Sequence, residues 1–291
     1  MNIRKKLLIV AMTFGIMNNT NAASVLETNM INSYVDALTY QAPSTENMAS
    51  AEQLFMSLFS THAIGLNDLT AWNALGFNIT QVTEGNNNYA IISEPSPQAG
   101  TGRGFYIINL SNQSQNILTM PHRPSDLYTH LIGYKLLIEK NYAAAAWNTT
   151  RRTNADLAKE EMSYFNSFVT AVAKSFPAPN VIQLHAFDAT SHEIDGDMIL
   201  SSTKKQLPPA NYDNIANCLK AQLIGTRVFT ILQYPKDLNE LGGTLNINAK
   251  KFYLANPNGF FFHVEMSQEL RLQLRDNVNL RNIFSNCFVG T

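Results

Sequence analysis

The chain has 291 residues, of which 21 are lysine or arginine and 22 are aspartate or glutamate, so its net charge is close to zero. It contains no basic patch with interleaved aromatic residues, which argues against nucleic acid as a partner. No run of about 18 uninterrupted apolar residues is present, so we expect no membrane anchor.

Residues 1–22 have the three-part pattern of a secretory signal peptide. A positive end with three basic residues precedes an apolar core at 7–17, and small residues follow before the expected cleavage site. Loss of three of the 21 basic residues leaves 18 against 22 acidic ones, so the mature chain carries about four net negative charges. We therefore expect a secreted or periplasmic protein whose mature part is a single domain at 23–291.

Only two cysteines are present, Cys218 and Cys287. In an oxidising compartment, a disulfide is the expected state of such a pair, rather than a reactive thiol. Their spacing alone does not show that they meet.

Residues 23–100 are expected to form an accessory layer beside the main sheet. Apolar spacing predicts two amphipathic helices, and two short β-type runs flank a polar turn and predict a hairpin. These elements are predicted at 49–60, 67–75 and 78–93. The glycine-rich run at 100–104 precedes a strand and does not connect a strand to a helix, so we interpret it as a turn and not as a phosphate-binding loop.

From residue 105 onward, apolar runs alternate with segments of helical periodicity, which predicts an α/β sheet with helices on both faces. The predicted strands are 105–110, 117–120, 142–147, 180–187, 198–202, 227–233 and 259–265. The predicted helices are 126–138, 155–176, 212–223 and 268–284.

The first strand-to-helix corner, at 117–138, presents two chemical groups together. Pro121 ends the strand because proline cannot donate to a ladder, so His122 lies at the strand's carboxyl end. Ser125 is a good helix N-cap, which places Asp126 in the first helical turn. An acid is also favoured there by the exposed N–H groups of a helix, so Asp126 has a purely structural alternative.

Two further predicted strands end in similar groups, His185 on one and Glu265 on the other. If the three strands are parallel neighbours, both side chains meet His122 and Asp126 at one edge of the sheet. Two imidazoles and a carboxylate, with a second carboxylate as general base, form a catalytic zinc site. A single histidine at a strand end is usually structural, so the recurrence of such groups at strand ends is what favours a site.

Other candidates are weaker. His263 shares a strand face with Glu265, which allows a supporting role beside the ligands. The carboxylate of Glu265 ends a very apolar run and needs a partner, for which Arg271 or Arg275 is available. The acidic loop 188–197 lacks the spacing of a calcium loop and is expected to be a solvated turn. No nucleophile elbow, H-E-x-x-H helix, P-loop or dinucleotide fingerprint is present.

An ordered set of these residues comprises Pro121-His122, Arg151-Arg152 with Asp156, His185 and Glu265. The set resembles the motifs of the zinc-dependent carboxypeptidases and the N-formylglutamate amidohydrolase-like hydrolases. The resemblance extends over roughly 105–284 and implies a phosphorylase/hydrolase-like, three-layer α/β/α fold with a mixed, mostly parallel central sheet. The implied roles are zinc ligation by His122 and His185, acid–base chemistry by Glu265, and binding of a substrate carboxylate by Arg151 or Arg152.

One spacing departs from the family pattern. Carboxypeptidases place the first histidine and the carboxylate as H-x-x-E, whereas His122 and Asp126 give H-x-x-x-D. Positions three and four apart share a helix face, so we expect Asp126 to serve as the third metal ligand.

These observations predict a secreted zinc-dependent hydrolase that cleaves an amide or peptide bond near a free carboxylate. Small peptides, cell-wall fragments and N-acyl amino acids fit as substrates. The alternative is an exported, non-catalytic binding or interaction protein on a hydrolase-like fold. Substrate identity and oligomeric state do not follow from the sequence.

Overall fold

The computed structural model describes residues 24–35, 39–96 and 100–289, so the expected signal peptide lies outside the described residues. The strands are β1 Asn78–Glu84, β2 Asn87–Ser93, β3 Phe105–Asn109, β4 Asn116–Met120, β5 Ala144–Trp147, β6 Asn180–Ala186, β7 Met198–Ser201, β8 Ile231–Tyr234 and β9 Phe260–Met266. The helices are α1 Val25–Asn32, α2 Thr45–Thr61, α3 Leu66–Ala74, α4 Thr129–Glu139, α5 Tyr164–Ser175, α6 Ala189–His192, α7 Ala210–Gln222, α8 Ile247–Ala255, α9 Gln268–Asp276 and α10 Val278–Val289.

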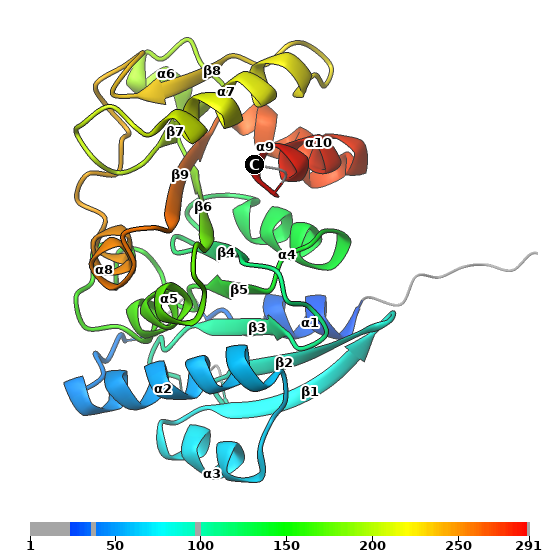
Figure 1. The fold of residues 1–291 in the computed structure, drawn as a ribbon, viewed down its shortest axis with the longest axis vertical. Helices are drawn as coiled ribbons and strands as arrows, with labels where there is room; N and C mark the ends of the chain where they lie inside the picture. Colours follow the sequence, from blue (N-terminus) through cyan, green and yellow to red (C-terminus); the bar gives the residue numbers. More distant parts are fainter. Residues whose placement is uncertain (1–23, 36–38, 97–99, 290–291) are drawn as a thin grey trace, which may run out of the picture.

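The strands form one mixed sheet in the order β1-β2-β3-β5-β4-β6-β9-β7-β8. Its centre is parallel, because β4 pairs in parallel with both β5 and β6, and β6 pairs in parallel with β9. Helices cover both faces (Figure 1), so the predicted three-layer α/β/α fold is confirmed. The carboxyl ends of β4, β6 and β9 therefore lie at one edge of the sheet, as the sequence predicted.

Two apolar cores lie on opposite faces of this sheet. Leu118, Ile182 and Phe262 are aligned neighbours that pack into the core under α1, α4, α7, α9 and α10. The residue before each of them packs into the other core, under α2, α3, α5 and α8. Successive side chains of a strand point to opposite faces, so a strand buried on both sides is a continuous apolar run. The apolar residues that fill both cores lie within the strands, so polar groups can occupy the strand ends.

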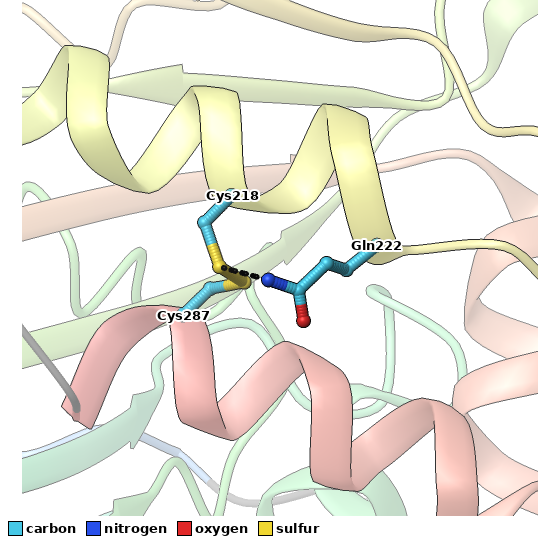
Figure 2. Close-up of a disulfide and its surroundings, with 3 residues drawn as sticks. All are labelled: Cys218, Gln222 and Cys287. Carbon is cyan, nitrogen blue, oxygen red and sulfur yellow. Dashed lines mark hydrogen bonds between the residues drawn. A yellow bond between two sulfur atoms is a disulfide. The ribbon is translucent and has the colours of Figure 1, made fainter.

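The disulfide joins Cys218 of α7 to Cys287 of α10 and confirms the expected state of the two cysteines. Figure 2 shows the bond between the two helices, with Gln222 beside Cys218. Both helices lie on the same face of the sheet (Figure 1), next to the core that contains Phe262. In the described ranges, no helix combines the length and apolarity needed to cross a membrane.

The helix predicted from residue 126 begins later, at Thr129, so the placement of Asp126 in a helical turn was wrong. Tyr128 has left-handed backbone geometry, with φ of 72°, and the chain cannot run helically through it. Ser125 is therefore not an N-cap. Asp126 lies in a turn closed by its own N–H, which donates to the carbonyl oxygen of His122 at 3.0 Å.

Two other predicted helices differ from the structure. The helix expected at 155–176 begins only at Tyr164, because the side-chain amide of Asn166 binds two carbonyl oxygens of the preceding segment and holds it across the helix start. The helix expected at 268–284 is divided into α9 and α10 at Asn277. That residue is extended and caps α10 through its side chain.

The strand expected at 227–233 is shortened to β8, which pairs with β7 only from Ile231. Residues 224 and 228 bridge each other in a turn, which keeps this part of the chain out of the ladder. Helices α1, α6 and α8 were not predicted. Helix α8 follows Asn246, whose side chain caps it by accepting the N–H of Ala249 at 3.1 Å.

Candidate metal centre

Three donor atoms converge at the carboxyl edge of the sheet: Nδ1 of His122, Nδ1 of His185 and Oδ2 of Asp126. The two nitrogens are 3.0 Å apart, and each lies 3.2 Å from the carboxylate oxygen. Zinc–ligand bonds of about 2.0–2.1 Å in a tetrahedral site place neighbouring ligand atoms about 3.3 Å apart. All three side chains are buried, so the arrangement has the size and composition of a metal centre.

The turn after β4 brings Asp126 to this point. The hydroxyl of Thr129 donates to its carbonyl oxygen at 2.7 Å, and the backbone N–H of Ala186 donates to its carboxylate at 3.2 Å. The second bond ties the turn to the end of β6, one residue after His185. Asp126, four residues after His122, therefore reaches the metal centre through a turn, and not through a helix face shared with His122.

The outer nitrogen of each imidazole has an oxygen acceptor. Nε2 of His122 lies 2.7 Å from Oδ1 of Asp156, and Nε2 of His185 lies 2.9 Å from Oε1 of Gln183. When Nε2 carries the proton, Nδ1 keeps its lone pair and faces the other donor atoms. Partners of this kind orient metal-binding histidines and raise their basicity.

A chain of buried amides determines which way Gln183 points. Asn166 donates to two backbone carbonyl oxygens, which only accept, so its own Oδ1 accepts from Asn248 at 2.6 Å. Oδ1 of Asn248 then accepts from Nε2 of Gln183 at 3.0 Å. Oε1 of Gln183 is left facing His185, and Asn246 donates to the same oxygen. The backbone carbonyl oxygens of Glu160 and Glu161, on a different segment of the chain, thus specify the tautomer of His185.

The electrostatics of the three groups suit a cation. Burial lowers the pKa of His185 to about 4, so its ring is neutral at neutral pH. Burial by itself also lowers the pKa of His122, but hydrogen bonds to Asp126 and Asp156 outweigh it and raise the value. For Asp126, burial raises the pKa, while its contacts with the two imidazoles outweigh burial and hold the pKa well below its usual range. The carboxylate therefore stays ionised despite its burial.

Glu265 lies beside the three donors because it is the register partner of His185 on β9. Its Oε1 accepts from Nε2 of His263 at 3.1 Å, whereas its Oε2 is buried and has no hydrogen-bond partner in the described structure. Burial raises its pKa, but the bond from His263 and the nearby imidazoles outweigh burial and lower it. The expected pairing with Arg271 or Arg275 is wrong: Arg275 instead pairs with Asp276 at 2.5 Å.

A cavity of about 310 Å³ opens onto this centre and is lined by both candidate histidine ligands, Glu265, Arg152 and the segment 239–246. Gly243 in that segment has φ of 62°, and a Cβ there would lie 2.9 Å from the ring of His263. Glycine therefore lets the backbone pass directly over the imidazole. Glu265 and the two histidines thus share one chamber with room for a small substrate.

The structure separates the two arginines that the sequence offered for a substrate carboxylate. Arg152 lines the cavity, and its Nε lies 3.4 Å from Oδ2 of Asp156. Arg151 is exposed and is not among the lining residues. Asp156 was named only as part of a family pattern, and Gln183 was missed altogether, because a lone glutamine in an apolar strand gives no local signal of a contact with histidine.

No protein-family model matches the chain, and no curated protein matches it in sequence. Three solved structures are similar to the chain only at low identity and low TM-score. N-formylglutamate amidohydrolase from Ralstonia eutropha JMP134 is 10% identical with a TM-score of 0.39, covering 62% of this chain and 93% of that one. Zinc-free apo YNDL is 15% identical, with a TM-score of 0.37 and coverages of 59% and 82%. A bacteriophage poly-gamma-glutamate hydrolase is 10% identical, with a TM-score of 0.38 and coverages of 74% and 87%. These values establish no family for the chain.

Proposed function

We propose that this protein is an exported, zinc-dependent hydrolase that cleaves an amide or peptide bond near a free carboxylate. The observation that carries the proposal is the convergence of Nδ1 of His122, Nδ1 of His185 and Oδ2 of Asp126, with mutual separations of 3.0–3.2 Å. Two imidazoles and one carboxylate as ligands suit zinc better than calcium or magnesium, which prefer oxygen ligands.

Zinc bound there supplies a Lewis acid for the scissile carbonyl and lowers the pKa of a water towards about 7. Glu265 accepts the proton of the attacking water and returns it to the leaving amine. Oε2 suits this role because it is ionised and has no hydrogen-bond partner in the described structure, while His263 holds Oε1 and Glu265 lines the chamber. Of the two arginines expected to orient a substrate carboxylate, Arg152 lines this cavity and Arg151 does not. The hydroxyl of water ends on the acyl carbon, and its proton ends on the amine.

Metal content tests the ligand assignment directly. The wild-type chain should bind about one zinc per molecule by elemental analysis, and His122→Ala with His185→Ala should bind almost none. His62→Asn is a matched control, because His62 lies at the end of α2, away from the centre, in a left-handed conformation that asparagine tolerates. Unchanged zinc content in the double variant would refute the site.

Catalysis is tested separately with Glu265→Gln, which keeps the shape of the side chain and removes its basicity. We expect zinc binding to persist and hydrolysis of a panel of short peptides and N-acyl amino acids to fall by about 100-fold or more. A wild-type protein that binds zinc and hydrolyses none of the panel, nor cell-wall fragments, would favour the alternative of a non-catalytic binding protein. Equal activity of wild type and Glu265→Gln would refute the role of Glu265.

A further inference from the structure

A second and larger cavity, of about 970 Å³, adjoins the metal centre. Asp126 forms part of its wall, and Arg152 lines both cavities, so the two spaces adjoin at Arg152. The remaining wall comes from the segment after β6, from 194–197 and from the first turns of α9. The proposed mechanism uses no residue of this remaining wall.

Arg271, in the first turn of α9, lines this cavity and differs from its other charged residues. The residue is only 6% exposed, and its Nη1 donates to the carbonyl oxygen of Met266 at 3.0 Å. Nε is buried without a hydrogen-bond partner, and among the described residues the guanidinium forms no ion pair. A guanidinium has five N–H donors, and leaving them unmet in a buried place is costly. Arg271 is therefore a buried cation with donors to spare.

Three of the acidic residues that line this cavity are engaged by neighbours, whereas Asp195 is exposed. Asp197 accepts from Arg227 at 2.6 Å, and Glu269 accepts from the same guanidinium at 3.0 Å. Asp188 caps α6 by accepting the N–H of Thr190 at 3.1 Å. Asp197 and Glu269 are thus paired with Arg227, and Asp188 is engaged in capping, so none of these three forms an ion pair with Arg271 among the described residues.

The position of Arg271 relates it to the chemistry next door. The negative charges of Asp126 and Glu265 raise the pKa of the Arg271 guanidinium, but burial has the larger effect and lowers that pKa. An anion that binds here would sit close to the metal centre but outside the chamber that contains Glu265. A carboxylate matches the planar, forked array of N–H donors of the Arg271 guanidinium and its single positive charge.

We propose that Arg271 is the receptor for a substrate carboxylate, in place of Arg151 or Arg152. The substrate then spans both cavities, with its scissile amide beside His122 and Glu265 and its acidic group in the second cavity. This placement of the scissile bond rests on the proposed function, whereas the anion site stands on Arg271 and its cavity alone. The substrate class is accordingly an amide that carries an acidic group beyond the cleaved bond.

The anion site is tested with glutarate as the probe and the full-length chain freed of metal, so that zinc cannot bind the carboxylate. Isothermal titration at fixed ionic strength should show saturable binding to wild type that weakens about tenfold or more in Arg271→Gln. Arg275→Gln is the matched control, because Arg275 lies one turn further on the same helix and pairs with Asp276. Binding that is absent in wild type, or equal in wild type and Arg271→Gln, would overturn the proposal.

Two further measurements keep the test decisive. If Arg271→Gln does not fold, Arg271→Lys retains the charge without the planar fork and should still weaken glutarate binding by about threefold or more; an unchanged Kd would overturn the proposal. In the zinc-loaded enzyme, Arg271→Gln should raise KM for amides with a free acid and not for their methyl esters, with little change in kcat. Absence of any hydrolysis would refute the proposed function while leaving the glutarate result intact.

Discussion

Replacing Gln183 by methionine tests whether the buried amide chain holds His185 ready to bind metal. The change keeps the length of the side chain and removes Oε1, which lies 2.9 Å from Nε2 of His185. The outer N–H of the imidazole is then buried without an acceptor, at a cost of about 1–3 kcal/mol. The ring recovers part of this cost by rotating or by moving its proton to Nδ1, and either change removes the Nδ1 lone pair from the metal centre.

Zinc affinity of Gln183→Met should therefore fall about 10–100-fold, which corresponds to about 1.4–2.8 kcal/mol. Competition with a chromophoric chelator at neutral pH measures this affinity, and circular dichroism confirms that the variant is folded. Thr119→Val is the matched control: Thr119 is the register partner of Gln183 on β4, and its buried hydroxyl has no hydrogen-bond partner in the described residues. Its zinc affinity should stay within about twofold of wild type. A folded Gln183→Met variant with wild-type zinc affinity would refute the role of the buried amide chain in holding His185.

Two further predictions concern stability. Replacing Cys218 and Cys287 together by serine should lower the free energy of unfolding by about 4 kcal/mol, because the disulfide joins residues 69 positions apart and restricts the unfolded chain; a loss below about 1 kcal/mol in urea unfolding would contradict this. Burial raises the pKa of Asp197, but the bonds from Arg227 outweigh it and lower the value, so their ion pair should stabilise the fold above about pH 4 and lose its effect as the pH falls further. The stability difference between wild type and Arg227→Met should thus be larger at about pH 6 than at about pH 3, and an equal difference at both would exclude the pair as its source.

The sequence by itself determined the centre of the sheet. The runs that become β4, β6 and β9 are apolar throughout because they are buried on both faces, and this pattern is visible without coordinates. Pro121 stops the first run, so His122 had to lie at a carboxyl end. Parallel pairing then brought His185 and Glu265 to the same edge, as expected.

Only the tertiary structure decided how these groups are held and what surrounds them. Asp126 arrives through a turn that depends on the left-handed backbone of Tyr128, which no propensity of tyrosine predicts. The amide chain to Gln183 and the unmet donors of Arg271 depend on residues distant in sequence, and neither has a spacing that could be read in advance. Local patterns specify strands, faces and ends, because these follow from burial. Contacts between side chains of separate elements follow from register and packing, which exist only once the chain has folded.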